Sequence, residues 1–331
     1  MRSYSQYIGG DLYRCLLCPV GCELREGDRG KCQVRGVKDD KIDLLSYGQI
    51  TSLAVEPIEK KPFYHFMPGT KVLSFSTLGC NFSCKFCQNY QISQSSSVPM
   101  KRLSLEKAVS TAILKECQGI CMTYNEPIPS YEYLIDLAEK AHQAGLYFVV
   151  NTNGYVEKEP WADICDTVDA INIDYKATNN NEYCRITGAT GSPYYVMLTR
   201  LLEVIDRKNI HLEISVPVFY NSTVKDYDGF RRFISYHNAH LPVHLLRVIS
   251  DHKMIGDPAT PESLLLELQE YLHQKLSFVY IENVFSEKAK QYRRTLCPYC
   301  QHVIVERDSF DISTHFDDGC GVCSSFFVLP K

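Results

Sequence analysis

The sequence lacks the features that would direct a chain into or across a membrane. Its first residues, MRSYSQYIGGDLYR, contain no apolar core of signal-peptide length, and no later apolar run approaches a membrane span. It also lacks a strong excess of one charge, because the formal net charge of the 331 residues is -4. We therefore expect a cytoplasmic protein with no membrane partner, and the charge gives no reason to expect nucleic-acid binding.

Low-complexity sequence is almost absent too, with QSSS at 94–97 as the exception. The hydrophobic fraction of 45% and the charged fraction of 22% are ordinary for a soluble globular protein. A chain of this length can bury a large core and still have room for smaller attached modules.

Cysteine is the residue that the sequence has in excess. Eleven of its fifteen cysteines fall into three tight groups. These groups are Cys15, Cys18, Cys22 and Cys32; Cys80, Cys84 and Cys87; and Cys297, Cys300, Cys320 and Cys323. Disulfides explain them poorly, because cytosolic thiols are kept reduced and the middle group is odd in number. Thiols clustered at such spacings indicate metal sites.

Between residues 71 and 283, short apolar runs alternate with segments of helical period. The runs that we interpret as buried strands are KVLSFSTL (71–78), GICMTY (119–124), LYFVVNT (146–152), DAINIDYK (169–176), IHLEISVP (210–217), VHLLRVIS (243–250) and FVYIEN (278–283). The helical segments are LEKAVSTAILKEC, YEYLIDLAEKAHQAG, YVMLTRLLEVIDRK and PESLLLELQEYLHQK. This alternation predicts an α/β fold with a parallel sheet, either open or curled into a partial barrel.

Polar clusters follow the first four predicted strands. The three-cysteine loop follows the first, and TYNEP (123–127), NTNG (151–154) and DYK (174–176) follow the next three. Because functional sites of parallel α/β folds gather at the carboxyl ends of the strands, we expect these four elements to share one rim.

The loop TLGCNFSCKFCQN offers three thiolates in a C-x3-C-x2-C spacing. That is one ligand fewer than a closed structural zinc site or a fully ligated four-iron cluster requires, so one position stays open to an outside ligand. The alternative is a zinc site completed by a distant residue such as His65.

With Phe86 before its last cysteine, this loop resembles the CxxxCxΦC motif of the radical S-adenosylmethionine (SAM) enzymes. The resemblance implies a partial (β/α)6 barrel and a [4Fe-4S] cluster on Cys80, Cys84 and Cys87. It further implies that the open iron binds SAM and that an electron from the cluster cleaves the sulfonium to give a 5′-deoxyadenosyl radical. The chemistry then belongs to the cofactor, and the protein positions it and excludes water.

The resemblance also assigns cofactor-binding roles to the other rim residues. Glu126, with Asn125 beside it, corresponds to a motif that accepts hydrogen bonds from the methionyl ammonium; a turn before Pro127 is the alternative. Asn151, Thr152 and Asn153 resemble the DTNG stretch of pyruvate formate-lyase activase, and Asp174 and Lys176 resemble its DxK. Asn151 replaces an aspartate that helps to bind a cation there, and Asp174 could equally be a strand-end cap. Lys176 would pair with the methionyl carboxylate.

The two terminal cysteine groups predict closed metal sites. CPYC (297–300) and CGVC (320–323) match a zinc-ribbon pattern, in which four thiolates satisfy tetrahedral zinc. The spacing of Cys15, Cys18, Cys22 and Cys32 suits zinc or a second [4Fe-4S] cluster, with a slight preference for zinc. We therefore divide the chain into an N-terminal four-cysteine module and connector (1–70), a barrel (71–285) and a zinc-ribbon-like module (286–331).

The whole set of motifs is similar to the radical SAM enzyme of the AmmeMemoRadiSam system. The similarity lies in the N-terminal cysteine spacing, EPIEKKPFYHFMPG (56–69), GCNFSCKFCQN, TYNEP and IDYKA. The chain departs from that family at VHLLRVISDHKM (243–254), which keeps Arg247 as a rim residue, at NEYCRITGA, which contains Cys184, and at VYIENVF. These are places where substrate could be met, and Cys184 is a candidate hydrogen-atom donor to a substrate radical.

Several alternatives stay open at this point. Lys60, Lys61 and His65 could face the cluster, or EKKPFYHFMPG could be a strut that joins the N-terminal module to the barrel. The enzyme could be a glycyl-radical-enzyme activase, or the chain could be a non-enzymatic iron–sulfur or zinc adaptor. As an enzyme it needs an electron donor, of the flavodoxin or ferredoxin kind, and an unidentified peptide or small-molecule substrate.

Overall fold

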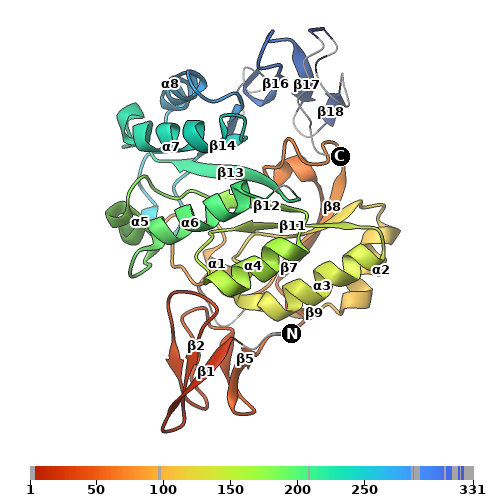
Figure 1. Ribbon diagram of the computed structural model, residues 1–331, viewed down its shortest axis with the longest axis vertical. Coiled ribbons are helices and arrows are strands. Elements are labelled where there is room, and N and C mark those ends of the chain that lie inside the picture. The colour runs from red at the N-terminus through yellow and green to blue at the C-terminus, as the bar shows by residue number, and fades with distance from the viewer. Residues whose placement is uncertain are drawn as a thin grey trace.

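A computed structural model describes residues 4–95, 98–207, 209–284, 286, 291–308, 311–314, 320 and 322–323 (Figure 1). Its centre is an eight-stranded sheet with the strand order β15-β14-β13-β12-β11-β10-β8-β7. The strands are β7 (Ser52–Pro57), β8 (Lys71–Ser76), β10 (Gly119–Met122), β11 (Tyr147–Thr152), β12 (Ala170–Asp174), β13 (His211–Val218), β14 (Val243–Arg247) and β15 (Val279–Glu282).

From β8 to β15 every neighbouring pair of strands is parallel, and their order in the sheet is their order in the chain. A doubly wound sheet reverses its order at a switch point, whereas a barrel does not. The sheet has two ends, with β7 antiparallel on β8 at one of them. The predicted α/β fold with a parallel sheet core is therefore confirmed.

Helices cover the outer face of this sheet (Figure 1). They are α2 (Leu105–Leu114), α3 (Tyr131–Gln143), α4 (Lys158–Thr167), α5 (Asn180–Thr187), α6 (Pro193–Ile205), α7 (Asp228–Asn238) and α8 (Glu262–His273). Outward strand residues such as Phe75 and Val150 join the main core with helix residues such as Leu134 and Ile164. The sequence pattern had predicted α2, α3, α6 and α8, but not α4, α5 and α7, whose segments carry more charge and fewer apolar residues.

Small sheets flank the barrel at its two ends in Figure 1. The N-terminal part contains β1 (Ser5–Gly9), β2 (Leu12–Cys15), β3 (Glu23–Leu24), β4 (Arg35–Lys38), β5 (Lys41–Leu44) and β6 (Gln49–Ile50), which pairs with β9 (Lys101–Arg102). The C-terminal part contains β16 (Thr295–Leu296), β17 (Val303–Asp308) and β18 (Asp311–Thr314). Our three-part division stays a proposal, with β7 of the first part built into the main sheet.

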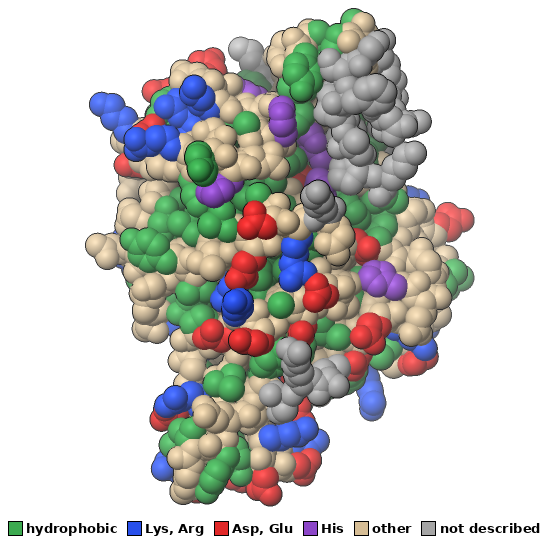
Figure 2. Space-filling view, in the orientation of Figure 1, with side chains coloured by type: hydrophobic (Ala, Val, Ile, Leu, Met, Phe, Trp, Pro, Cys, Tyr) green, Lys and Arg blue, Asp and Glu red, His purple; other side chains and the backbone are tan. Residues whose placement is uncertain are grey.

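The face of the molecule drawn in Figure 2 mixes acidic and basic side chains, without a continuous basic area among its described residues. None of the described helices has the length and apolar character needed to cross a membrane.

Candidate functional site

The three-cysteine loop leaves the carboxyl end of β8 and is tied down on two sides. The backbone N–H groups of Ser83 and Lys85 donate to the carbonyls of Thr187 and Ile186, both at 2.8 Å, at the end of α5. On the other side the Asn89 amide donates to the Tyr124 carbonyl, also at 2.8 Å. The loop therefore has a fixed path between α5 and the segment after β10.

A pocket of about 260 Å³ opens beside this loop. Cys84 and Cys87 line it from the loop together with Phe86, and residues at the ends of further strands of the sheet, β10, β12 and β14 among them, contribute to its wall. Those residues include Tyr124 after β10, Asp174 and Lys176 at the end of β12, and Leu246 and Arg247 at the end of β14. The pocket thus brings thiols, an acid and two bases together at the carboxyl edge of the sheet.

The charges in this pocket are held in place. Lys176 Nζ donates to Asp174 Oδ2 at 2.8 Å and lies 5.8 Å from the centre of the Phe86 ring. Burial alone would lower the pKa of Lys176, but Asp174, Cys84 and Tyr183 raise it overall, so the amine stays cationic. Arg247 Nε donates to the Thr260 carbonyl at 2.8 Å, which leaves its other nitrogens for the pocket.

Glu126 lies behind the pocket rather than in its wall. Its side chain is buried, and its two carboxylate oxygens accept from Ile128 N (3.2 Å), Thr152 Oγ1 (2.7 Å) and Asn153 N (2.8 Å). Burial raises the pKa of Glu126 to about 7, although these three hydrogen bonds oppose the shift. Glu126 therefore joins the segments after β10 and β11.

Two asparagines extend this support to the cysteine loop. Asn153 Nδ2 donates to Asn81 Oδ1 at 2.8 Å, so the segment after β11 holds the residue next to Cys80. Asn125 Nδ2 donates to the Gly79 carbonyl at 2.8 Å and to Thr77 Oγ1 at 3.1 Å. Asn125, Glu126, Thr152 and Asn153 thus form a scaffold for the loop.

Two of the predicted site residues lie away from the pocket. Asn151 donates from Nδ2 to the Lys61 carbonyl at 3.0 Å, deeper inside the barrel. Cys184 lies on α5 with its sulfur 3.7 Å from the Gly191 carbonyl oxygen, and it is not among the described residues that line the pocket.

Comparison with known proteins fits this geometry. A model of the radical SAM superfamily matches residues 74–234, from β8 to α7. An uncharacterized protein of Methanocaldococcus jannaschii is 35% identical over 304 residues, which are 90% of this chain and 88% of that protein. The chain belongs to the radical SAM superfamily. It is an enzyme of that superfamily, whose members use a [4Fe-4S] cluster and SAM and require a reductant and a substrate.

Two further proteins are more distantly similar to this chain. A second M. jannaschii protein, provisionally named a glycyl-radical enzyme activating enzyme, is 24% identical over 224 residues, 64% of this chain and 79% of that protein. The solved structure of Streptococcus suis SuiB bound to precursor peptide SuiA has a TM-score of 0.50 at 12% identity, covering 70% of this chain and 52% of that one. At such an identity the likeness shows the fold alone.

The segment EKKPFYHFMPG fills the inner face of the radical SAM sheet. Asn151, Asn172 and Glu213 are neighbours in register on β11, β12 and β13. They bind the backbone of this segment: Asn151 at Lys61 O, Asn172 at Pro62 O (2.7 Å), and Glu213 at the N–H groups of residues 64 and 65 (3.0 and 2.8 Å). This arrangement agrees with the strut alternative.

The lysines of this segment are tied to one carboxylate. Lys60, Lys61 and the Tyr124 hydroxyl all donate to Glu56, and Lys61 Nζ lies 4.1 Å from the centre of the Tyr124 ring. Tyr124 also has a positive φ of 71° and lines the pocket. In the sequence, Tyr124 stands out only as part of TYNEP, and its neighbours Asn125 and Glu126 are the signal that could have found it.

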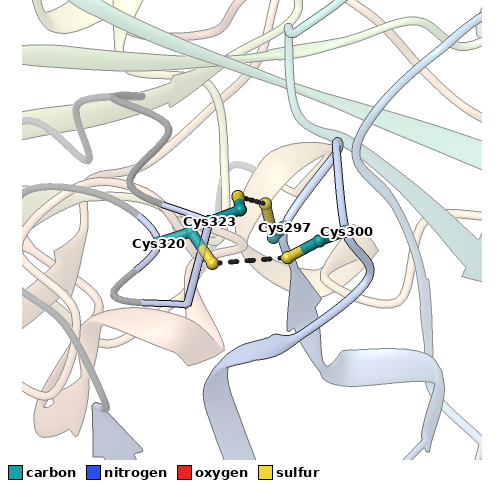
Figure 3. Close-up of side chains that lie close together, drawn as sticks. All are labelled: Cys297, Cys300, Cys320 and Cys323. Carbon is teal, nitrogen blue, oxygen red and sulfur yellow. Dashed lines mark hydrogen bonds between the residues drawn. The ribbon is translucent and has the colours of Figure 1, made fainter.

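The C-terminal cysteines converge, as Figure 3 shows. Cys297 Sγ lies 3.6 Å from Cys323 Sγ, Cys300 Sγ lies 3.5 Å from Cys320 Sγ, and all four sulfurs lie within 4.8 Å of one another. Bonds of about 2.3 Å to tetrahedral zinc place thiolate sulfurs about 3.8 Å apart. The group fits a metal ion, and zinc remains our prediction.

Proposed function

We propose that this radical SAM enzyme binds its [4Fe-4S] cluster through Cys80, Cys84 and Cys87 and cleaves SAM reductively in the adjoining pocket. The observation that carries the proposal is the junction of two loop thiols, Phe86 and the fixed Lys176 cation around one cavity. A site with three thiolates leaves one iron for an outside ligand. When bound, the cluster and SAM supply the electron and the 5′-deoxyadenosyl radical that start the reaction.

The residues of the pocket have separate tasks in this proposal. Lys176 pairs with the methionyl carboxylate, because a half-buried cationic amine forms a strong charge-assisted hydrogen bond. Asp174 orients Lys176 and offers a carboxylate to the methionyl ammonium. Arg247 lines the cavity from the end of β14, where it can bind a polar group of the substrate.

The scaffold behind the pocket positions the loop. We propose Glu126, Thr152, Asn153 and Asn125 as positioning residues, since their hydrogen bonds are made to one another and to the loop. Asn151 has the same kind of role toward the inner segment. Cys184 would have to reach the pocket from α5 to donate a hydrogen atom to a substrate radical.

The narrower family assignment is also proposed. The motifs quoted above support the radical SAM enzyme of the AmmeMemoRadiSam system, acting on an unidentified peptide or small molecule with an electron donor such as a flavodoxin or ferredoxin. The provisional name of the second M. jannaschii relative favours one other candidate, the activation of a glycyl-radical enzyme. The genes beside this one distinguish the two: Memo-like and AMMECR1-like neighbours support the first, and a glycyl-radical domain the second.

Cofactor cleavage provides the direct test. Anaerobically reconstituted protein, reduced with dithionite, should convert SAM to 5′-deoxyadenosine, and Cys84→Ala should abolish the product. Cys165→Ala is the matched control, because Cys165 is equally buried but lies on α4. Turnover that persists in Cys84→Ala would disprove the cluster assignment.

A further inference from the structure

The N-terminal cysteines enclose a cavity of their own. Cys15, Cys18, Cys22 and Cys32 all line it, and apolar side chains such as Leu17 and Val20 shield it. Cys15 and Cys32 are buried, and the other two are half-buried. Thiols that surround a dry space are typical ligands of an inorganic centre.

A backbone donor is aimed at one of the four sulfurs, because the N–H group of Lys31 donates to Cys22 Sγ at 3.4 Å. Hydrogen bonds of this kind stabilise metal-bound thiolates and tune their centre.

Arg35, a buried cation, is also part of the wall of the N-terminal cavity. The Arg35 side chain is 2% exposed and lines the cavity, with Nη1 and Nη2 bound to the Glu132 carboxylate. Its Nε, however, has no hydrogen-bond partner in the described structure. A buried guanidinium donor without an acceptor is costly, so it points to an acceptor that the protein atoms do not supply.

The distances between the sulfurs distinguish this group from the C-terminal one. Four sulfurs within 4.8 Å of one another suit a single ion, as at Cys297, Cys300, Cys320 and Cys323. Among the described residues, neither the N-terminal four nor the three loop cysteines form such a compact group. A cubane cluster needs wider spacing, because each thiolate binds a different iron, and its sulfides can accept from a donor such as Arg35 Nε.

We propose that Cys15, Cys18, Cys22 and Cys32 bind a second [4Fe-4S] cluster, whose four thiolate ligands leave no iron open to SAM. The proposal goes beyond SAM cleavage in the pocket and does not depend on it. Asn81, which lies next to Cys80, also lines the N-terminal cavity, so a residue of the radical SAM loop would contact the second cluster.

Metal analysis of the full-length chain tests this inference. In a Cys80→Ala/Cys84→Ala/Cys87→Ala variant, reconstituted anaerobically, we expect about four irons and four sulfides per chain and about one zinc. The Mössbauer spectrum should be that of a [4Fe-4S] cluster, and it should not change when SAM is added. Iron below one equivalent would overturn the proposal, whether one or two zinc ions are found.

A second variant keeps the test valid if the triple variant does not fold. Cys18→Ala/Cys32→Ala with the loop intact should lose the iron that does not respond to SAM, which is half of the wild-type iron, and keep its zinc. If this variant instead loses one zinc and retains all its iron, the N-terminal group is a zinc site and the proposal is wrong. Failure of SAM cleavage with both clusters present would count only against the function proposed for the pocket.

Discussion

The two halves of the inner face of the sheet serve different purposes. Toward the amino ends of the strands, the face is filled by the chain itself. Phe63 and Phe66 pack there on Val149 and Ala170, and the polar side chains of β11, β12 and β13 bind the backbone of residues 61, 62, 64 and 65. Asp174 lies two residues beyond Asn172 at the end of β12, and it lines the open pocket. We call these the filled half and the open half. Polar residues on one face of a sheet can therefore be structural ties or site residues. Their position along the strand, nearer its amino or its carboxyl end, separates the two kinds.

The largest expected effect concerns the module that anchors the filled half. Arg307 of β17 is buried and donates to the Tyr64 carbonyl at 2.7 Å. In a Cys297→Ala/Cys300→Ala variant the C-terminal metal should be lost completely, because structural zinc sites fold only with their metal. The unfolding temperature should fall, while the cluster absorbance persists. Loss of iron with retention of zinc, measured by elemental analysis, would show that this group holds a cluster instead.

The next effect would come from within the filled half. Glu213 is buried and binds His244 Nε2 at 2.6 Å besides the two backbone N–H groups of the inner segment. Glu213→Ala leaves these donors unpaired, so unfolding free energy should fall by roughly 3–5 kcal/mol in denaturant titration.

Glu267→Ala on the exposed face of α8 is the control for Glu213→Ala and should stay within about 0.5 kcal/mol of wild type. At temperatures where Glu213→Ala is folded, its SAM affinity should equal that of wild type. A large loss of affinity would break the distinction between the two halves.

The open half should behave in the opposite way. Lys176→Met removes a charge-assisted hydrogen bond to the methionyl group, worth roughly 1.5–3 kcal/mol. SAM binding should therefore weaken by about ten- to a hundredfold in calorimetric titration, with unchanged iron content. Wild-type affinity in this variant would place the cofactor elsewhere.

The smallest effect is a pH dependence of the filled half. Burial alone would raise the pKa of Glu56, but hydrogen bonds from Lys60, Lys61 and Tyr124 lower it to about 2. A depressed pKa stabilises the fold above the unfolded value and loses that contribution as the pH falls toward 2. Wild type should lose about 1 kcal/mol of unfolding free energy from this group between about pH 6 and pH 4. In Glu56→Gln this part of the slope should be absent.

The sequence predicted the parallel strands and the cysteine groups, because apolar runs and close thiols are local signals. It could not separate Asn151 from Asn153, although they are only two residues apart. Two residues of a strand span about 6.6 Å, which is enough to pass from the scaffold behind the cysteine loop to the filled half. Likewise, the backbone N–H partners of Glu213 lie almost 150 residues earlier in the chain, and no local pattern shows that they meet.

Gly79, one residue before Cys80, sets a limit on taking the enzyme apart. A side-chain carbon on Gly79 would lie 2.0 Å from the Cys32 carbonyl oxygen, so the N-terminal module occupies the space that a larger residue would need. The backbone of the N-terminal cysteine group therefore packs directly against the start of the three-cysteine loop. A barrel cut at residue 71 would lack that contact, and the loop transplanted into another barrel would lack it as well. The smallest piece of this chain that can be expected to carry a properly shaped radical SAM loop thus begins ahead of the barrel, with the first cysteines.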